Sequence, residues 1–134
     1  MLSFLENNGF VYVFENTKTN RIKVGMTGVS IESRLKPLNQ QYGNTTYING
    51  DKNLPISYWK FRIAYVTKNY DEVESLSHKY LKKYTDKNSP IGEIFNCTIS
   101  DAEEAIKMAL NDLNLFDNAK RINGWEELNY FYIR

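Results

Sequence analysis

The chain has 134 residues, of which 42% are hydrophobic and 25% charged, and its formal net charge is +1. These values are typical of a soluble globular protein with one compact domain, and they exclude a global basic field. The single cysteine, Cys97, excludes an intrachain disulfide. Residues 1–6 lack the features of a signal peptide, and no apolar stretch is long enough to span a bilayer. We therefore expect a cytoplasmic protein that does not associate with membranes.

The chain opens with a β-hairpin pattern. Residues 10–15 are aromatic or β-branched, residues 17–20 form a polar turn, and residues 21–24 give the returning strand.

The register of this hairpin decides which side chains share a sheet face. If Asn16 pairs with Arg21 across the turn, Phe14 faces Lys23 and Tyr12 lies diagonal to Lys23 on the same face. A slip of one residue would move Lys23 to the opposite face. The spacing therefore predicts a phenol and an ammonium close together on the sheet.

A short helix and a third strand follow. Ser30 is a good helix N-cap, and we expect the helix to end by Gly43, with Pro37 kinking or shortening it. Residues 42–56 have the composition of a long loop, and residues 58–67 are typical of another strand.

The second half of the chain is mainly helical. Asp71 is expected to cap a second helix, a short strand begins at Glu93, and a capping box over residues 100–103 precedes a third helix. Residues 125–133 favour a final helical turn or an edge strand. We predict one α+β domain over residues 1–134, with a small central antiparallel sheet of about three to four strands flanked by helices.

Charged residues are unevenly distributed, which leaves two interpretations open. Basic residues gather early and in the middle of the chain, and acidic residues gather later. One interpretation is a basic face with an acidic back, and the other is a solvated surface of mixed charge.

Two polar positions carry chemical information. His78 is the only histidine and follows Glu74 by four residues, so both lie on one helix edge. No second histidine or cysteine cluster completes a tetrahedral zinc site. Glu93 starts an apolar strand, and a single carboxylate with open coordination positions suits catalytic Mg²⁺. Taken singly, each residue also has an ordinary explanation as core, surface or helix cap.

The order of the motifs resembles the GIY-YIG nuclease superfamily, in the branch named after a bacteriophage T5 open reading frame. The matching segments are Gly9–Tyr12, Lys23–Thr27, Arg34–Asn39, Glu74–His78 and Glu93–Phe95. The resemblance covers residues 9–110 and leaves residues 111–134 as a C-terminal extension. Lys23 stands where the superfamily name has its second tyrosine, as is usual in this branch.

The resemblance implies a metal-dependent endonuclease that hydrolyses phosphodiester bonds, with DNA more expected than RNA, and of phage or mobile-element origin. It implies that Glu93 holds Mg²⁺ (or Mn²⁺) and that Arg34 contacts the scissile phosphate. Tyr12 would position or deprotonate water, Lys23 would lower the pKa of Tyr12, and His78 would relay protons.

A nucleic-acid substrate also needs contacts to its phosphate backbone, for which we expect Lys18, Arg21, Lys36, Lys82 and Lys83. Two alternatives remain open. One is a catalytically silent domain that binds nucleic acid or a protein, such as a phage inhibitor of host defence. The other is a plain α+β interaction domain in which the motif matches are coincidental.

Overall fold

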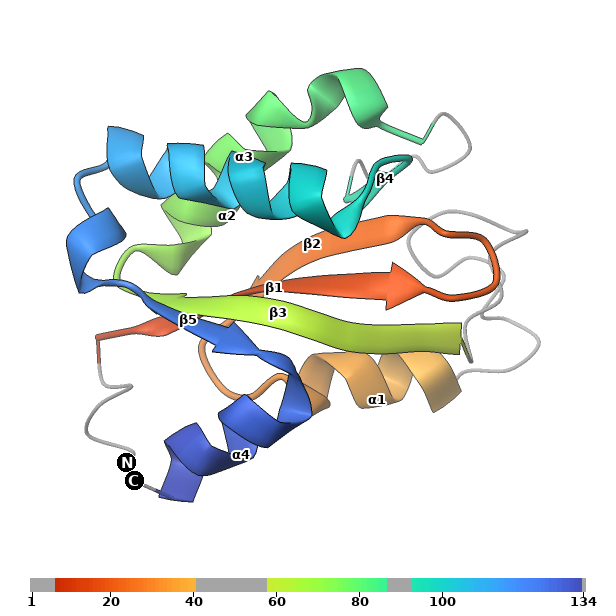
Figure 1. Ribbon diagram of the computed structural model, residues 1–134, viewed down its shortest axis with the longest axis horizontal. Coiled ribbons are helices and arrows are strands. Elements are labelled where there is room, and N and C mark those ends of the chain that lie inside the picture. The colour runs from red at the N-terminus through yellow and green to blue at the C-terminus, as the bar shows by residue number, and fades with distance from the viewer. Residues whose placement is uncertain (1–6, 41–57, 87–92, 134) are drawn as a thin grey trace.

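The computed structural model describes residues 7–40, 58–86 and 93–133 (Figure 1). Its elements, in chain order, are β1 (Gly9–Asn16), β2 (Ile22–Thr27), α1 (Glu32–Gln40), β3 (Trp59–Thr67), α2 (Tyr70–Tyr80), the 3-10 helix η4 (Lys82–Tyr84), β4 (Ile94–Phe95), α3 (Ile99–Asp112), the 3-10 helix η5 (Phe116–Asn118), β5 (Lys120–Asn123) and α4 (Gly124–Ile133).

The strands form an open antiparallel sheet in the order β4-β2-β1-β3-β5. The mixed class is as predicted, but five strands replace the expected three to four. The additional strand is β5, which the sequence analysis missed. It is short and polar, and only Ile122 of its four residues is buried, so it lacks the apolar alternation of a recognisable strand.

The hairpin has the expected register. The Asn16 amide donates to the Arg21 carbonyl at 2.8 Å, Phe14 pairs with Lys23, and Tyr12 pairs with Gly25. Paired residues and residues two apart share a sheet face. Tyr12 and Lys23 therefore lie on the same face.

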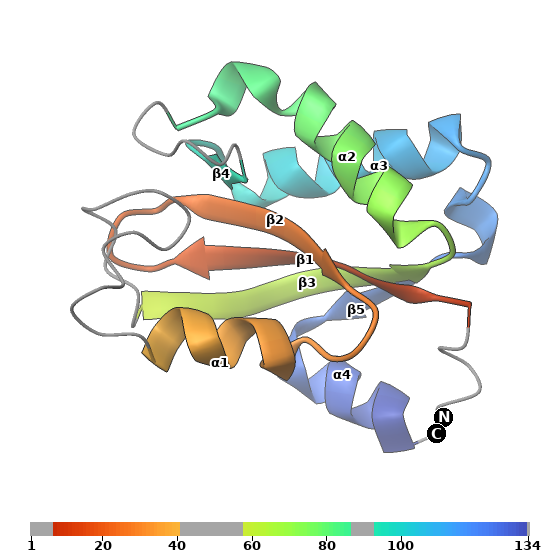
Figure 2. The same ribbon diagram turned by 180° about the vertical axis from the view of Figure 1, so that it is seen from behind.

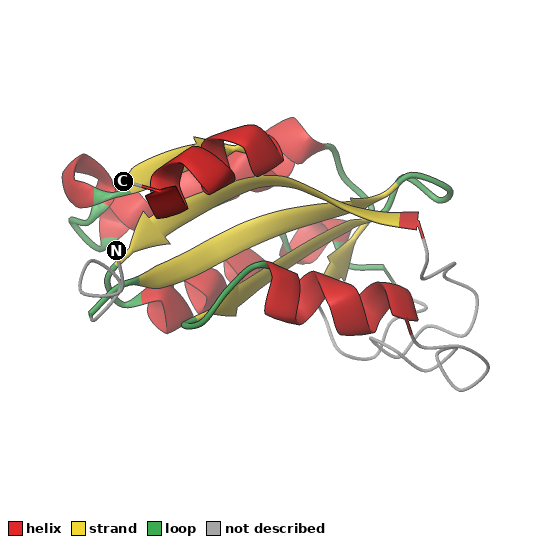
Figure 3. Ribbon diagram, turned by 90° about the horizontal axis from the view of Figure 1, so that it is seen from below, coloured by secondary structure: helices red, strands yellow, loops and turns green. Residues whose placement is uncertain are grey.

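Helices cover both faces of the sheet. The pair α2 and α3 packs on one face, and α1 and α4 lie on the other (Figures 1 and 2). Figure 3 views the molecule from the α1 and α4 side. Alternate residues of β1 supply both cores: Phe10, Tyr12 and Phe14 on the α1 and α4 face, and Val11 and Val13 on the other.

Two predicted helix starts need correction. Helix α2 begins after Asn69, which has a left-handed backbone and no capping side chain, whereas Asp71 lies inside the first turn. The capping box of α3 joins Thr98 to Asp101 rather than lying at residues 100–103, because each of these two side chains accepts from the other's backbone amide, at 3.0 and 3.1 Å.

Further predictions can be compared with the structure. The Ser30 hydroxyl accepts from the Ser33 amide at 3.1 Å, as expected for a cap, whereas α1 continues through Pro37, so the proline does not end the helix. Residues 125–133 lie in the helix α4. The expected loop over residues 42–56 falls outside the described residues. Of the helices the structure describes, none is long and apolar enough to cross a membrane.

Candidate active site

The candidate site lies at the outer edge of β2, immediately beyond the short strand β4. On the β2 side, β4 pairs with Ile22 and Lys23. At the next residue, the Val24 amide donates to the Glu93 carbonyl at 3.3 Å, and the Val24 carbonyl is 2.7 Å from His78 Nε2. A histidine from α2 thus takes the place of a neighbouring strand, which brings α2 against the sheet edge.

Tyr12 lies across Gly25 on the neighbouring strand. A Cβ atom at Gly25 would be 2.3 Å from the Tyr12 hydroxyl oxygen and 2.5 Å from the ring carbon that carries it. Only a glycine leaves room for the phenol here. The glycine of the Lys-Val-Gly segment is therefore explained by the tyrosine opposite it.

Lys23 and Glu93 form an ion pair. Lys23 Nζ lies 2.7 Å from Glu93 Oε1, with the lysine side chain 10% exposed and the glutamate side chain 32% exposed. The pairing of Lys23 with Ile94 in the β2–β4 ladder places Glu93 at this position. The predicted metal ligand therefore has a cation beside it.

Glu74 is a second carboxylate of the site. Burial raises its pKa to about 7, with a further contribution from the charge of Glu93, and Lys23 and Arg34 oppose the shift. The sequence analysis places Glu74 in a motif but gives it no part in the chemistry, because helix capping also explains it. The signal for such a part is its position four residues before His78, on the same helix edge.

The expected lowering of the Tyr12 pKa is wrong, because the pKa is raised. Burial is the largest cause and the charge of Glu93 adds to it, Arg34 opposes the shift, and Glu74 makes a smaller contribution that raises it. Glu93 neutralises the Lys23 ammonium, which explains why the lysine does not favour the phenolate. Tyr12 is therefore a protonated phenol at neutral pH.

His78 has a defined tautomer. A carbonyl oxygen can only accept, so Nε2 carries the proton donated to Val24, and Nδ1 is the unprotonated nitrogen of the neutral ring. Burial lowers the pKa of His78, and the ring packs on Phe95 with its centroid 5.4 Å away. The imidazole is thus neutral at pH 7, with Nδ1 as a proton acceptor.

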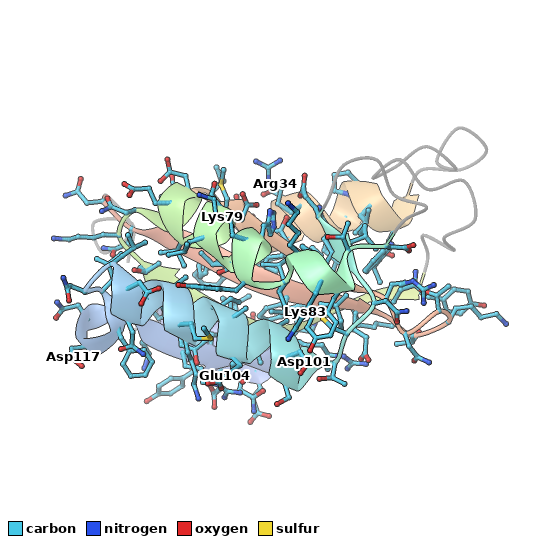
Figure 4. The ribbon with its side chains drawn as sticks, turned by 90° about the horizontal axis from the view of Figure 1, so that it is seen from above. Arg34, Lys79, Lys83, Asp101, Glu104 and Asp117 are labelled. Atoms are coloured by element: carbon cyan, nitrogen blue, oxygen red, sulfur yellow. The ribbon has the colours of Figure 1, made fainter. Side chains whose placement is uncertain are left out.

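Arg34 reaches the site from α1 and is exposed. Figure 4 shows it between α1 and α2. Its charge opposes the pKa shifts that burial causes in Tyr12 and Glu74, which places the guanidinium near both. It also lines an open hollow of about 620 Å³ with Met26 and Asp71. Within the described part of the chain, the guanidinium has no hydrogen bond or ion pair.

The residues expected to contact a phosphate backbone are spread over several elements. Lys18 is exposed in the β1–β2 turn, Lys36 is exposed on α1, and Lys82 is exposed on η4. Lys83 is also exposed, with its ammonium 5.1 Å from the centre of the Tyr84 ring. Arg21 is partly engaged, because its Nε donates to Asp86 at 2.9 Å.

The structure brings the five predicted catalytic residues to one place and adds Glu74. They come from β1, β2, α1, α2 and the segment before β4, and they lie around the edge of the sheet rather than on one face. Across the three described segments, no three His, Cys, Asp or Glu side chains form a metal-binding group. The carboxylates available to a metal here are Glu74 and Glu93.

A family model for the T5orf172 domain matches residues 9–110, a span that contains every residue of this site. The chain belongs to the T5orf172 domain family. The family suggests a nuclease-like or nucleic-acid-binding domain. Strand β5 and helix α4 lie beyond the T5orf172 match. No significant match was found among curated proteins or among solved structures.

Proposed function

We propose that this T5orf172 domain is a metal-dependent endonuclease that hydrolyses phosphodiester bonds in nucleic acid, with DNA as the expected substrate. The observation that carries the proposal is the convergence of an exposed arginine, a neutral histidine, a buried phenol and two carboxylates at one open sheet edge: Arg34, His78, Tyr12, Glu74 and Glu93. Phosphodiester hydrolysis needs an activated water and neutralisation of the charge that develops on the phosphate, and these groups can supply both.

Arg34 is the residue that binds the scissile phosphate. Its guanidinium is exposed and makes no ion pair within the described residues, so it has donors available for phosphate oxygens. A guanidinium matches the geometry of a phosphate with two parallel hydrogen bonds. This contact strengthens as negative charge develops in the transition state.

His78 and Tyr12 act on the attacking water. The neutral imidazole accepts a proton at Nδ1 while Nε2 stays bound to the Val24 carbonyl. The protonated phenol of Tyr12 donates a hydrogen bond and orients the water, which replaces the proton-abstracting role considered from the sequence.

Two carboxylates fit a divalent cation. The negative charge of Glu93 repels that of Glu74 and contributes to the raised pKa of Glu74. A cation bound between the two carboxylates would remove this repulsion. Mg²⁺ is commonly held by one or two carboxylates together with substrate phosphates. Glu93 and Glu74 would hold it, and it would supply charge neutralisation at the phosphate oxygens.

A second candidate is a catalytically silent domain that binds nucleic acid. The ion pair between Lys23 and Glu93 favours it, because the ammonium already neutralises one of the two carboxylates at 2.7 Å. The two candidates differ in whether any divalent metal ion produces turnover.

Arg34→Ala separates these candidates. In single-turnover cleavage with Mg²⁺, we expect the rate at saturating DNA to fall by about 10²-fold or more, with a much smaller change in affinity. Lys36→Ala, an exposed cation two residues away on α1, is the matched control and should retain the rate at saturation. Equal rates for the two variants would contradict the role of Arg34.

Glu93→Gln tests the metal dependence. We expect this variant not to cleave DNA, and the wild type not to cleave it in EDTA. We also expect Mg²⁺ to raise the melting temperature of the wild type but not that of the variant. Binding without turnover by the wild type, in Mg²⁺ and in Mn²⁺, would instead establish the silent candidate.

A further inference from the structure

One side of α2 carries a row of titratable residues at the candidate site. Asp71, Glu74 and His78 are spaced by three or four residues, which places them along one helix edge, and Lys82 begins η4 just beyond the end of α2. The charge of Asp71 contributes to the raised pKa of Glu74, after burial and Glu93, so the two carboxylates are close. The row begins at a carboxylate and is followed by an ammonium, with the site between them.

The surroundings of the row strengthen this asymmetry. Lys79 is exposed and adds a second cation at the C-terminal end, whereas Asp71 and Glu72 outweigh Lys68 at the N-terminal end. The hollow beside Arg34 lies on the Asp71 side, and Arg34 is the one cation among the described residues that line it.

The neighbouring helix α3 does not extend the basic surface. Figure 4 shows Lys79 on α2, whereas Asp101 and Glu104 lie along α3 with Asp117 beyond its end. A polyanion is therefore attracted to the C-terminal half of α2 and repelled from α3.

We propose that the protein holds nucleic acid on one side of the scissile phosphate only. The backbone runs from Arg34 along the C-terminal half of α2, past Lys79 and Lys82, and the phosphates on the Asp71 side are left without a partner. Lysine contacts to phosphate carry no sequence information, so this grip is independent of sequence. The inference rests on the proposed function, since it takes Arg34 as the scissile position.

The spacing of the residues along α2 is similar to the spacing of phosphates along DNA. An α-helix rises about 1.5 Å per residue, so the end of α2 at Tyr80 lies about 3 Å beyond His78 along the helix axis, and Lys82 begins η4 just after it. Each strand of duplex DNA carries one phosphate per about 3.4 Å of the duplex axis. We therefore assign to Lys79 and Lys82 the phosphates next to the one at Arg34.

Binding without cleavage tests the two lysines. The Glu93→Gln protein in EDTA is titrated onto a DNA duplex at several salt concentrations, alone and with Lys79→Gln or Lys82→Gln added. We expect each lysine variant to lose about three- to tenfold in affinity and to reduce the slope of log K against log salt by roughly 0.9. Lys120→Gln on β5, the opposite edge of the sheet, is the control and should leave the slope unchanged.

Neutral methylphosphonate linkages test the asymmetry. They replace the phosphates on one side or the other of the mapped cleavage position, and we expect weaker binding from one side only. Asp71→Asn should strengthen binding by about two- to threefold by removing repulsion. Equal losses from the two sides, or unchanged slopes for Lys79→Gln and Lys82→Gln, would overturn the inference while leaving cleavage in place. Lysine-dependent binding of a duplex that the wild type never cuts would instead overturn the nuclease proposal and leave the lysine contacts standing.

Discussion

Gly25 is the residue that decides where the phenol of Tyr12 lies. The tyrosine is 3% exposed, and its ring occupies the space that a side chain at Gly25 would fill. Three atoms of the tyrosine lie within 2.8 Å of an added Cβ, including two ring carbons, so the whole ring would have to move. The hydroxyl then no longer has its place beside the carboxylates.

We expect Gly25→Ala to reduce cleavage by about 10²-fold while the protein stays folded, at a cost of about 1–3 kcal/mol in the free energy of unfolding. Single-turnover cleavage and chemical denaturation measure the two effects. The matched control is Gly28→Ala, where the added Cβ meets the far end of the Tyr70 side chain at 2.4 Å. Equal losses of activity in the two variants would show that Tyr12 is not responsible.

Glu74 makes stability depend on pH. Its pKa is about 7 in the folded protein, against an ordinary value of 4.5, because of burial and then Glu93. Between these two values the folded state binds more protons than the unfolded state, so the free energy of unfolding falls as pH rises through this window. Above pH 7 Glu74 is charged in the folded protein, and the free energy of unfolding is lowered by the whole cost of burying that charge.

Glu74→Gln should therefore raise stability at pH 8 by about 1 kcal/mol, a figure reduced for the partial exposure of the side chain, and should leave stability at pH 4 nearly unchanged. Denaturant titrations at the two pH values check this. Glu104→Gln, an exposed position on α3, is the control. A Glu74→Gln variant that is less stable at pH 8 would contradict the sign of the pKa shift.

At the scale of the elements, α3 depends on the reciprocal contacts of Thr98 and Asp101 at its start. These bonds satisfy two backbone amides that the helix itself leaves without a partner. The sequence analysis predicts the box two residues later, over Ser100 to Glu103. The structure corrects this, because Thr98 and Asp101 make the two reciprocal bonds.

We expect Thr98→Ala to cost about 1 kcal/mol in the free energy of unfolding, because the Asp101 amide loses its acceptor. Ser100→Ala should change stability by a few tenths of a kcal/mol or less. Thermal and chemical denaturation of both variants measure the difference. A larger loss from Ser100→Ala would restore the box that the sequence favoured.

The elements also show what the sequence could predict. Strands β1 and β3 and the apolar stripes of the helices follow from periodicity, and the hairpin register follows from one turn length. The bond of His78 to the Val24 carbonyl, the clustering of Glu74 with Glu93 and the protonated state of Tyr12 depend on tertiary packing. No local pattern encodes these distances or this burial.

At the scale of the whole molecule, the C-terminal extension completes the core. Ile122, Leu128 and Phe131 are buried in the same cluster as Phe10 and Phe61, although they lie beyond the T5orf172 match. The Phe131 ring meets the Phe10 ring edge to face at 6.2 Å. One face of the described sheet is therefore covered by α1 together with the C-terminal extension.

Phe131→Ala should therefore destabilise the protein by about 3–5 kcal/mol, as expected for loss of a buried aromatic ring. Tyr130→Ala, at a neighbouring position that is 65% exposed, should have an effect within about 0.5 kcal/mol. Chemical denaturation of both variants checks the contrast. If Phe131→Ala were as stable as the wild type, the extension would be dispensable for the fold.

The bond between His78 and the edge of β2 has a consequence for spectroscopy. The chain has one histidine, and its ring is half-buried. Its Nε2 donates a hydrogen bond to the Val24 carbonyl oxygen, with the two atoms 2.7 Å apart. Such a proton exchanges slowly with water, so a nitrogen-labelled sample should show one imidazole N–H resonance that needs no assignment. That single signal would report the effects of DNA, Mg²⁺ and pH on the candidate site in the intact protein.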